Sequence, residues 1–412
     1  MARIDIDHLS LELGRELDAR LADADAALAA QFPGDHAGRQ PIHTVYVAAD
    51  RYHPALVRDW GAEALATLEA HQRLFAELVG DDEIEARVRR KLAAEPIEDL
   101  RIDFEDGYGK RPDATEDRDA ATAGAALARS LAEGSAPPFS GIRIKSLEAP
   151  TRRRAVRTFI TFIDALAGAG ASLDAFVTTL PKVTSVEQVE AMVHLCERAE
   201  AEAGAQRLRF EIQVETPQSI LSPDGAALVA RMVHASAGRC TALHYGTYDY
   251  SAFCGIAAPY QSMAHPAADH AKLVMQAAAA GTGVRLSDGS TNVLPVGDDA
   301  GVRRGWQLHL ELVRRSLERG YYQGWDLHPA QLPSRYAATF AFYRDGLTDA
   351  QRRLRDYFEH VGSEILDEPA TVRALADYAL RALHCGAATP EEVGKATGLD
   401  AARLTELARP TR

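Results

Sequence analysis

The stretch LRFEIQVETP (residues 208–217) decides the fold of this chain. Apolar residues alternate in it with Glu211, Gln213 and Glu215, and a helical pattern follows Pro217. Because successive side chains of a strand point to opposite faces, the stretch predicts a strand with an apolar face toward helices and a polar face toward an interior. A strand followed at once by a helix is the repeating unit of a parallel α/β fold.

Similar strands recur along the chain and alternate with long helical stretches. Eight such strands predict an α/β fold of the (β/α)8, or TIM-barrel, type. The predicted strands are PIHTVYV (41–47), LRIDFED (100–106), GIRIKS (141–146), AFVTTLP (175–181), LRFEIQVE (208–215), ALHYGT (242–247), GVRLSDG (283–289) and GWDLH (324–328).

Helical patterns outside the strands predict the domain organisation. We expect a helical segment at residues 1–40, the barrel at residues 41–335 and an all-helical extension at residues 336–412. A helical insertion, at about residues 51–99, should separate the first two strands.

The C-terminal extension should contain helices near residues 349–366, 369–384, 389–397 and 400–408. Thr389, before a proline, is the expected N-cap of the third helix. The last two helices could form a helix-turn-helix, but they carry little positive charge, which favours packing over DNA binding.

The composition fits a globular protein and excludes some classes of partner. The 412 residues are 46% hydrophobic and 25% charged, and the formal net charge is −13. This charge disfavours nucleic acid, whose binding depends on clustered Lys and Arg, but an anionic small molecule can still be held by one arginine or a metal ion. The chain shows no signal-peptide pattern, no apolar run of membrane-spanning length and no CxxC motif. We therefore expect a cytoplasmic protein without membrane contact.

Two acidic residues stand at the ends of neighbouring predicted strands. Glu215 ends one strand, and Asp249 follows the next strand after a turn at Gly246. Barrel active sites form at this end of the strands, and two carboxylates completed by substrate oxygens and water are a typical Mg²⁺ site. Alone, Asp249 would more often be a turn or capping residue, so its pairing with Glu215 favours the metal site. We expect Gly246 and Thr247, in the same loop, to contact the substrate.

Charged residues also fall on the predicted interior face of other strands. Asp103 and Glu105 alternate with apolar residues in the second strand, as do Arg143 and Lys145 in the third. Buried charges need partners or a metal ion. A layer of structural ion pairs is the simpler explanation for any single one of these residues, such as Glu211 or Lys145.

Seven short motifs resemble, in the same order, those of the HpcH/HpaI aldolase and citrate lyase β-subunit superfamily, which includes malyl-CoA and citramalyl-CoA lyases. Together they cover roughly residues 42–335. The motifs are TVYVAADRYH, DFEDGYG, GIRIK, TTLPKV, QVETPQSI, GTYDYSA and GWDLHPAQ.

This resemblance implies a magnesium-dependent carbon–carbon lyase that acts on a 2-oxo or 3-hydroxy acid, with Mn²⁺ as an alternative ion and a CoA ester as an alternative form of the substrate. Position by position, it implies metal ligands at Glu215 and Asp249, a substrate-carboxylate arginine at Arg143 and a catalytic acidic pair at Glu105 and Asp106. Relatives assemble as trimers or hexamers, which predicts a homo-oligomer.

The sequence also departs from the superfamily pattern. The aldolase branch places a histidine base just after the second-strand glutamate, whereas Asp106 and Gly107 follow Glu105 here. This favours the citrate lyase and malyl-CoA lyase branch, yet residues 51–99 and the long helical C-terminus are unlike a citrate lyase β chain. The substrate is therefore left open, and the general base is unassigned.

Other activities fit part of the pattern. A thioester hydrolase could use the same metal site to activate water, and a non-catalytic barrel could bind an oxo acid. Lys182 or Lys145 would permit a Schiff-base aldolase, although that chemistry does not need the carboxylate pair. The run TRRRAVR (151–157) could hold the phosphates of CoA, although a solvated helix face is the more common explanation.

Three histidines have structural explanations. We expect His328 to be a buried hydrogen-bonding residue rather than a ligand. His265, Asp269 and His270 suggest a metal cluster, but a helix starts at Pro266, which favours helix capping over metal binding.

Overall fold

The computed structural model describes residues 4–36, 38–173, 176–204, 207–359 and 368–409. Its eight strands in these residues are all parallel and run in the order β7-β6-β5-β4-β3-β2-β1-β8. A bridge between Ser287 and Gln323 joins β7 to β8, so the predicted (β/α)8 barrel is confirmed. The strands are β1 (His43–Ala48), β2 (Asp99–Asp103), β3 (Phe139–Arg143), β4 (Phe176–Leu180), β5 (Arg209–Val214), β6 (Cys240–Tyr245), β7 (Arg285–Ser287) and β8 (Gly324–Asp326).

β2 and β3 each end three residues earlier than predicted. β2 ends at Asp103 because its carboxylate accepts hydrogen bonds from the N–H groups of Glu105 (3.0 Å) and Gly107 (2.8 Å), which turns the chain out of the sheet. β3 ends at Arg143. The prediction that Lys145 faces the interior is therefore wrong: its ammonium reaches outward to the carboxylate of Glu116, 2.7 Å away.

Helices cover the outside of the barrel and fill the predicted insertion. Between β1 and β2 lie η1 (Ala49–Arg51), α2 (Leu56–Ala70), α3 (Gln72–Val79) and α4 (Asp82–Ala94), as the sequence predicted. The other barrel helices and turns are α5 (Asp113–Ala132), α6 (Arg152–Gly168), α7 (Val186–Ala203), α8 (Pro217–Ile220), α9 (Leu228–Ala235), α10 (Thr247–Phe253), η2 (Ala258–Tyr260), α11 (Pro266–Ala279), α12 (Asp299–Glu318) and η3 (Pro329–Gln331).

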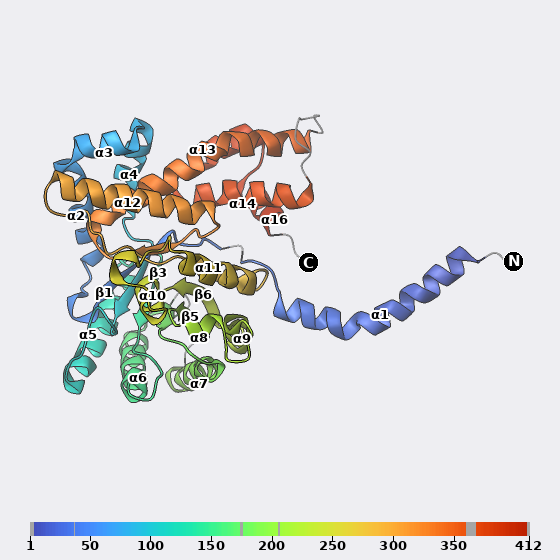
Figure 1. The fold of residues 1–412 in the computed structure, drawn as a ribbon, viewed down its shortest axis with the longest axis horizontal. Coiled ribbons are helices and arrows are strands. Elements are labelled where there is room, and N and C mark those ends of the chain that lie inside the picture. The colour runs from blue at the N-terminus through green and yellow to red at the C-terminus, as the bar shows by residue number, and fades with distance from the viewer. Residues whose placement is uncertain (1–3, 37, 174–175, 205–206, 360–367, 410–412) are drawn as a thin grey trace.

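The N-terminal helix stands apart from the barrel. Helix α1 (Ile6–Gln31) projects away from the rest of the molecule (Figure 1), and it has no buried residue. The prediction of a helical segment before residue 41 agrees with this helix. Among the described residues, no helix combines the length and the apolar composition needed to cross a membrane.

The C-terminal helices pack together beside the barrel (Figure 1). They are α13 (Leu332–Phe358), α14 (Pro369–Cys385), α15 (Pro390–Thr397) and α16 (Ala401–Ala408). Helix α13 starts earlier than the predicted 349–366, and residues 360–366 of that prediction lie outside the described residues. Thr389 caps α15 in a capping box with Glu392, as expected.

Helix α13 ties the extension to the barrel. Arg335 donates hydrogen bonds to both carboxylate oxygens of Asp326 at the end of β8, at 2.9 to 3.1 Å. Buried apolar residues of the barrel and of α13 to α16 form one continuous core. The extension therefore shares its hydrophobic core with the barrel.

A layer of buried ion pairs lies inside the barrel, on the N-terminal side of the mouth. The guanidinium of Arg101 donates to both carboxylate oxygens of Glu211, at 2.9 and 2.8 Å, and also binds Asp99. His244 lies 3.0 Å from Glu211 on the other side. Burial opposes ionisation of Glu211, but Arg101 and His244 hold its pKa well below the usual range. The structural explanation for Glu211 is confirmed.

Candidate functional site

Glu215 lies just beyond β5 at the C-terminal mouth of the barrel and is 1% exposed. Its Oε1 accepts a hydrogen bond from the N–H of Lys182 (2.7 Å), and its Oε2 accepts one from the side-chain amide of Gln213 (2.6 Å). Burial raises the pKa of Glu215 to about 8, and the nearby carboxylates of Asp249 and Glu105 add to the shift. This acid is buried with too little positive charge around it.

Asp249 lies in the first turn of α10, close to Glu215. Its side chain is 37% exposed, and both carboxylates line one cavity of about 640 Å³ at the mouth. The two strand ends approach closely at Gly246, where an added Cβ would lie 2.4 Å from the Cβ of Glu215. Glycine at position 246 is therefore a steric requirement of the site, and the structure places the two predicted metal ligands in the same cavity.

Lys182 has a role that the sequence did not predict. It follows β4 with a left-handed backbone (φ 52°), and its ammonium lies 2.5 Å from Glu105, 2.9 Å from Asp106 and 3.4 Å from Asp249. Although burial opposes it, the carboxylates of Glu215 and Glu105 raise the pKa of Lys182 well above its usual value. A protonated, ion-paired lysine is poorly suited to form a Schiff base. Its position in the strand-end motif TTLPKV was the available signal.

Glu105 and Asp106 both bind Lys182, but they differ in exposure. Glu105 is buried, and burial raises its pKa. The Asp106 side chain is 60% exposed and lines the cavity. Burial opposes the shift, but hydrogen bonds with Glu105 and Lys182 lower the pKa of Asp106. The predicted acidic pair thus lies in the site and holds the lysine.

Arg143 lies in the same cavity, and its main partner is Asp103. The Nε and Nη2 groups of Arg143 donate to the two carboxylate oxygens of Asp103, at 2.6 and 2.7 Å, and the guanidinium lies 4.7 Å from the ring centre of Tyr46. Glu105 is farther away, at 3.6 Å. Asp103, two residues before Glu105, is therefore the residue that holds Arg143, and Glu105 is a more distant second partner.

Thr247 offers an unused hydrogen-bonding group in this cavity. Its Oγ1 is buried and has no hydrogen-bond partner among the described residues. Gly289 lies against it, so that an added Cβ would be 2.0 Å from this oxygen. Because buried hydroxyl groups normally have partners, Thr247 is suited to bind a ligand. The backbone N–H and carbonyl of Gly246 are already bonded to Val214 and Tyr250.

His328 lines the mouth on the side of β8. Its Nδ1 accepts a hydrogen bond from the N–H of Ala330 (3.1 Å), and its Nε2 lies 3.8 Å from Glu63 of the insertion. The predicted hydrogen bonding is confirmed. The predicted burial is wrong, because the side chain is 31% exposed in the cavity.

The residues at the mouth suit a divalent cation. The carboxylates of Glu105, Asp106, Glu215 and Asp249 surround one ammonium group, while Arg143 is already neutralised by Asp103. Within the described residues, no three His, Cys, Asp or Glu side chains form a ready metal cage. A metal ion here would have Glu215 and Asp249 as protein ligands and oxygens of substrate and water for the rest, the arrangement that Mg²⁺ commonly adopts.

The remaining sequence candidates have structural roles. His265 caps α11 by accepting a hydrogen bond from the N–H of Ala267 (3.1 Å), as expected. In the run 151–157, Arg154 and Arg157 bind the carboxylate of Asp117 on the neighbouring helix. Both arginines are therefore engaged in helix packing.

Comparison with known proteins places the chain in a family. A family model described as a domain of unknown function, DUF6986, matches residues 21–412. The chain belongs to this family. No match was found among curated proteins.

Solved structures with the same fold include enzymes. Malate synthase of Haloferax volcanii is 14% identical, with a TM-score of 0.51 over 92% of this chain and 99% of that one. The protein CitE of Mycobacterium tuberculosis, solved with magnesium, acetoacetate and coenzyme A, is 17% identical, with a TM-score of 0.50 over 85% of this chain and 100% of that one. At these identities the comparison shows the fold alone: the chain has the fold of the Haloferax malate synthase and of CitE.

Proposed function

We propose that this protein is a Mg²⁺-dependent enzyme that makes or breaks a carbon–carbon bond next to the carboxylate of a small oxo or hydroxy acid. The observation that carries the proposal is the pair of Glu215 and Asp249 in one cavity, within an excess of negative charge. The protein groups around Glu215 do not balance its charge. A buried carboxylate of this kind is costly unless it binds a cation or a proton.

The solved structures of the same fold support this chemistry. CitE was solved with magnesium, acetoacetate and coenzyme A, and the Haloferax malate synthase with magnesium and glyoxylate, at 15% identity and a TM-score of 0.50 over 90% of this chain and 99% of that one. These ligands favour a 2-oxo acid or a related acid as the substrate here, with a CoA ester as an alternative form.

When bound, the ion would stabilise the negative charge that develops on the substrate oxygens as the bond forms or breaks. Arg143 would hold the substrate carboxylate. Asp103 occupies its Nε and Nη2 edge, so the substrate carboxylate would bind at Nη1, which donates to Gln213 at 3.4 Å and lies 3.6 Å from Glu105. The hydroxyl of Thr247 would supply a further hydrogen bond.

Lys182 and its two carboxylates would complete the site. Glu105 and Asp106 hold the ammonium at the edge of the cavity beside Asp249. The lowered pKa of Asp106 makes it a weak base, and the carboxylate of Glu105 is engaged by the ammonium of Lys182 at 2.5 Å. We therefore assign the pair to positioning Lys182 rather than to taking a proton from the substrate.

The test is calorimetric and chemical. With Mg²⁺ present, the protein should bind pyruvate, glyoxylate or oxaloacetate, and Glu215→Gln should abolish this binding, whereas Glu202→Gln at an exposed position should not. Unchanged binding by both Glu215→Gln and Asp249→Asn would overturn the metal assignment.

Product analysis distinguishes the activities. In the cleavage direction, incubation with a panel of hydroxy acids and their CoA esters should release a 2-oxo acid. In the condensation direction, free thiol should appear only when an oxo acid and an acyl-CoA are supplied together. A thioester hydrolase would release free thiol from the ester alone. If metal-dependent binding occurs and no product forms, the protein is a binding barrel rather than an enzyme.

A further inference from the structure

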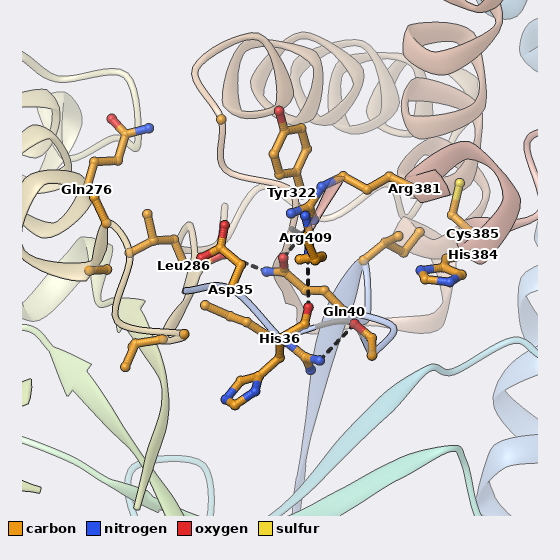
Figure 2. Close-up of a pocket in the computed structure, with 18 of the residues that line it drawn as sticks. Asp35, His36, Gln40, Gln276, Leu286, Tyr322, Arg381, His384, Cys385 and Arg409 are labelled. Carbon is orange, nitrogen blue, oxygen red and sulfur yellow. Dashed lines mark hydrogen bonds between the residues drawn. The ribbon is translucent and has the colours of Figure 1, made fainter. Parts of the chain in front are cut away.

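A second cavity lies at the opposite end of the barrel from the metal site. Its volume is about 370 Å³, and it separates the N-terminal strand ends from the C-terminal helices. The barrel contributes Gln40, before β1, and Arg285, at the start of β7, and the extension contributes Arg381 of α14 and Arg409 after α16. Figure 2 shows Arg381 and Arg409 converging beside Tyr322.

Three guanidinium groups line this cavity, and two of them bind the same carboxylate. Asp377 binds both Arg381 and Arg409, at 2.7 Å each. For Arg285, no carboxylate of the described residues lies within ion-pair distance. It donates a hydrogen bond to the backbone carbonyl of Gly38, at 3.1 Å. Asp35 also lines the cavity, but it is exposed to solvent.

Three groups in the cavity have pKa values that indicate a positive environment. Burial, followed by the charges of Arg381 and Arg409, lowers the pKa of Arg285 to about 10. Burial, followed by neighbouring arginines, also lowers the pKa of His36 and of His384. A chain with a net charge of −13 thus gathers three arginines around one cavity, and Asp377 offsets only part of their positive charge. Such an arrangement is costly unless an anion neutralises it.

Several donors remain free to bind an anion. Among the described residues, Arg381 uses Nε for Asp377 and Nη1 for the side-chain oxygen of Gln40 (2.9 Å), and its Nη2 has no hydrogen bond. Within the same part of the chain Arg285 uses Nη2, and its Nε and Nη1 have no partner. The free donors come from both sides of the cavity, from the barrel and from α14.

We propose that this cavity is a binding site for a small multivalent anion, with carboxylate or phosphate groups held between Arg285 of the barrel and Arg381 of the C-terminal helices. Arg409, whose own donors bind His36, Ala408 and Asp377, adds positive charge to the site. Arginine is suited to both groups because its planar fork of donors matches their oxygens. The volume is in the range of small-molecule sites. The site is separate from Glu215 and Asp249 and does not depend on the proposed function.

Binding would link the C-terminal helices to the barrel. The anion would contact arginines on both sides of the cavity, so it would bind the folded chain and not the unfolded one. Ligands of this kind raise the unfolding temperature in proportion to the logarithm of their concentration. The site is thus placed to make the packing of the extension depend on the supply of an anionic metabolite.

The test uses the full chain carrying Glu215→Gln, which removes metal-dependent binding at the other end of the barrel. Pyrophosphate and citrate are the probes, measured by calorimetry and thermal unfolding at constant ionic strength. We expect one of them to bind with a stoichiometry of one and to raise the unfolding temperature. Preference for pyrophosphate would identify a phosphate ligand, and preference for citrate a carboxylate ligand.

Two further variants test the location. Arg285→Gln should weaken binding at least tenfold, and it should fold, because it removes an uncompensated charge. Ala280→Phe, at an exposed lining position, should block the cavity without changing any charge. Arg303→Gln, which breaks an exposed ion pair with Glu77, is the matched control and should bind as the parent does. No binding of either probe, or equal binding by the parent, Arg285→Gln and Ala280→Phe, would overturn the proposal.

Discussion

Asp103 and Arg143 form a two-pronged ion pair in the cavity of the proposed metal site, with donor to acceptor distances of 2.6 and 2.7 Å. The same carboxylate also accepts the N–H groups of Glu105 and Gly107. One side chain thus ends β2, turns the next loop toward the site and orients the arginine. Both partners are almost fully buried, so neither can be removed without leaving the other uncompensated.

Asp103→Asn should therefore be strongly destabilising. Loss of one partner of a buried ion pair costs about 3 to 5 kcal/mol, and urea unfolding should show a decrease of that order. Asp345→Asn removes one partner of an exposed pair with Arg314 and should cost less than about 1 kcal/mol. Equal effects of the two substitutions would show that the buried pair does not contribute as argued.

Metal-free protein should lose stability as the pH rises. The pKa of Glu215 is about 8 when folded, against 4.5 for the ordinary value, so the folded chain keeps a proton that the unfolded chain releases. This contribution is complete below pH 4.5 and is lost as the pH rises toward 8, by roughly 1 kcal/mol for each unit. In EDTA, the free energy of unfolding of wild type relative to Glu215→Gln should fall between pH 5 and 8. Parallel pH profiles would contradict the assignment.

Gly246→Ala should damage the metal site directly. The added Cβ would lie 2.4 Å from the Cβ of Glu215, so one of the two loops must move. We expect a loss of about 1 to 3 kcal/mol in stability, typical of overpacking, and at least a tenfold loss of Mg²⁺ affinity by calorimetry. Gly14→Ala, on the exposed α1 with no atom within 4 Å of the added carbon, should change neither quantity.

Thr247→Val should separate binding from stability. Because the Thr247 hydroxyl is buried without a partner, its removal should leave the free energy of unfolding unchanged or slightly higher. Affinity for the oxo acid should fall about tenfold through the loss of one hydrogen bond. Thr179→Val should instead lower the free energy of unfolding and leave the affinity unchanged. Thr179 donates to Glu211 in the buried ion-pair layer and does not line the cavity. If Thr247→Val keeps full affinity, Thr247 does not contact the ligand.

Deletion of residues 1–31 should leave the barrel intact. Helix α1 has no buried residue, so its removal withdraws no core contact. The unfolding temperature and the Mg²⁺ affinity should match those of the full chain. Comparing both proteins by light scattering would also test whether α1 takes part in the predicted homo-oligomer. A large drop in unfolding temperature would show that α1 packs against the protein in solution.

The sequence predicted the strands well because their signal is local. Alternation within LRFEIQVETP places Glu211, Gln213 and Glu215 on one face, and the structure has all three in the barrel interior or at its mouth. The pair of Glu215 and Asp249 could be proposed for the same reason, since both follow recognisable strand ends. The position of a strand's end was less certain, because for β2 it depends on the hydrogen bonds of Asp103.

The alternation of apolar and polar residues could not predict which charged side chains pair with one another. Arg143 binds Asp103, 40 residues away, and Lys182 binds Glu105, 77 residues away. Many acids on the same face were equally compatible with the pattern. For Lys145 the alternating pattern gave the wrong face. It predicted a side chain in the barrel interior, but β3 ends before Lys145, and its ammonium binds Glu116 instead.

The sequence by itself therefore determined the barrel, the helical insertion and the two candidate metal ligands, because hydrophobic periodicity and strand-end motifs are properties of neighbouring residues. Only the tertiary structure decided that Asp103 holds Arg143, that Lys182 joins the acidic cluster, and that Arg285 and Arg381 face one cavity. These relationships depend on which distant segments the closed barrel and its C-terminal helices bring together. Burial then decides which of the assembled charges have partners and which are left for a ligand.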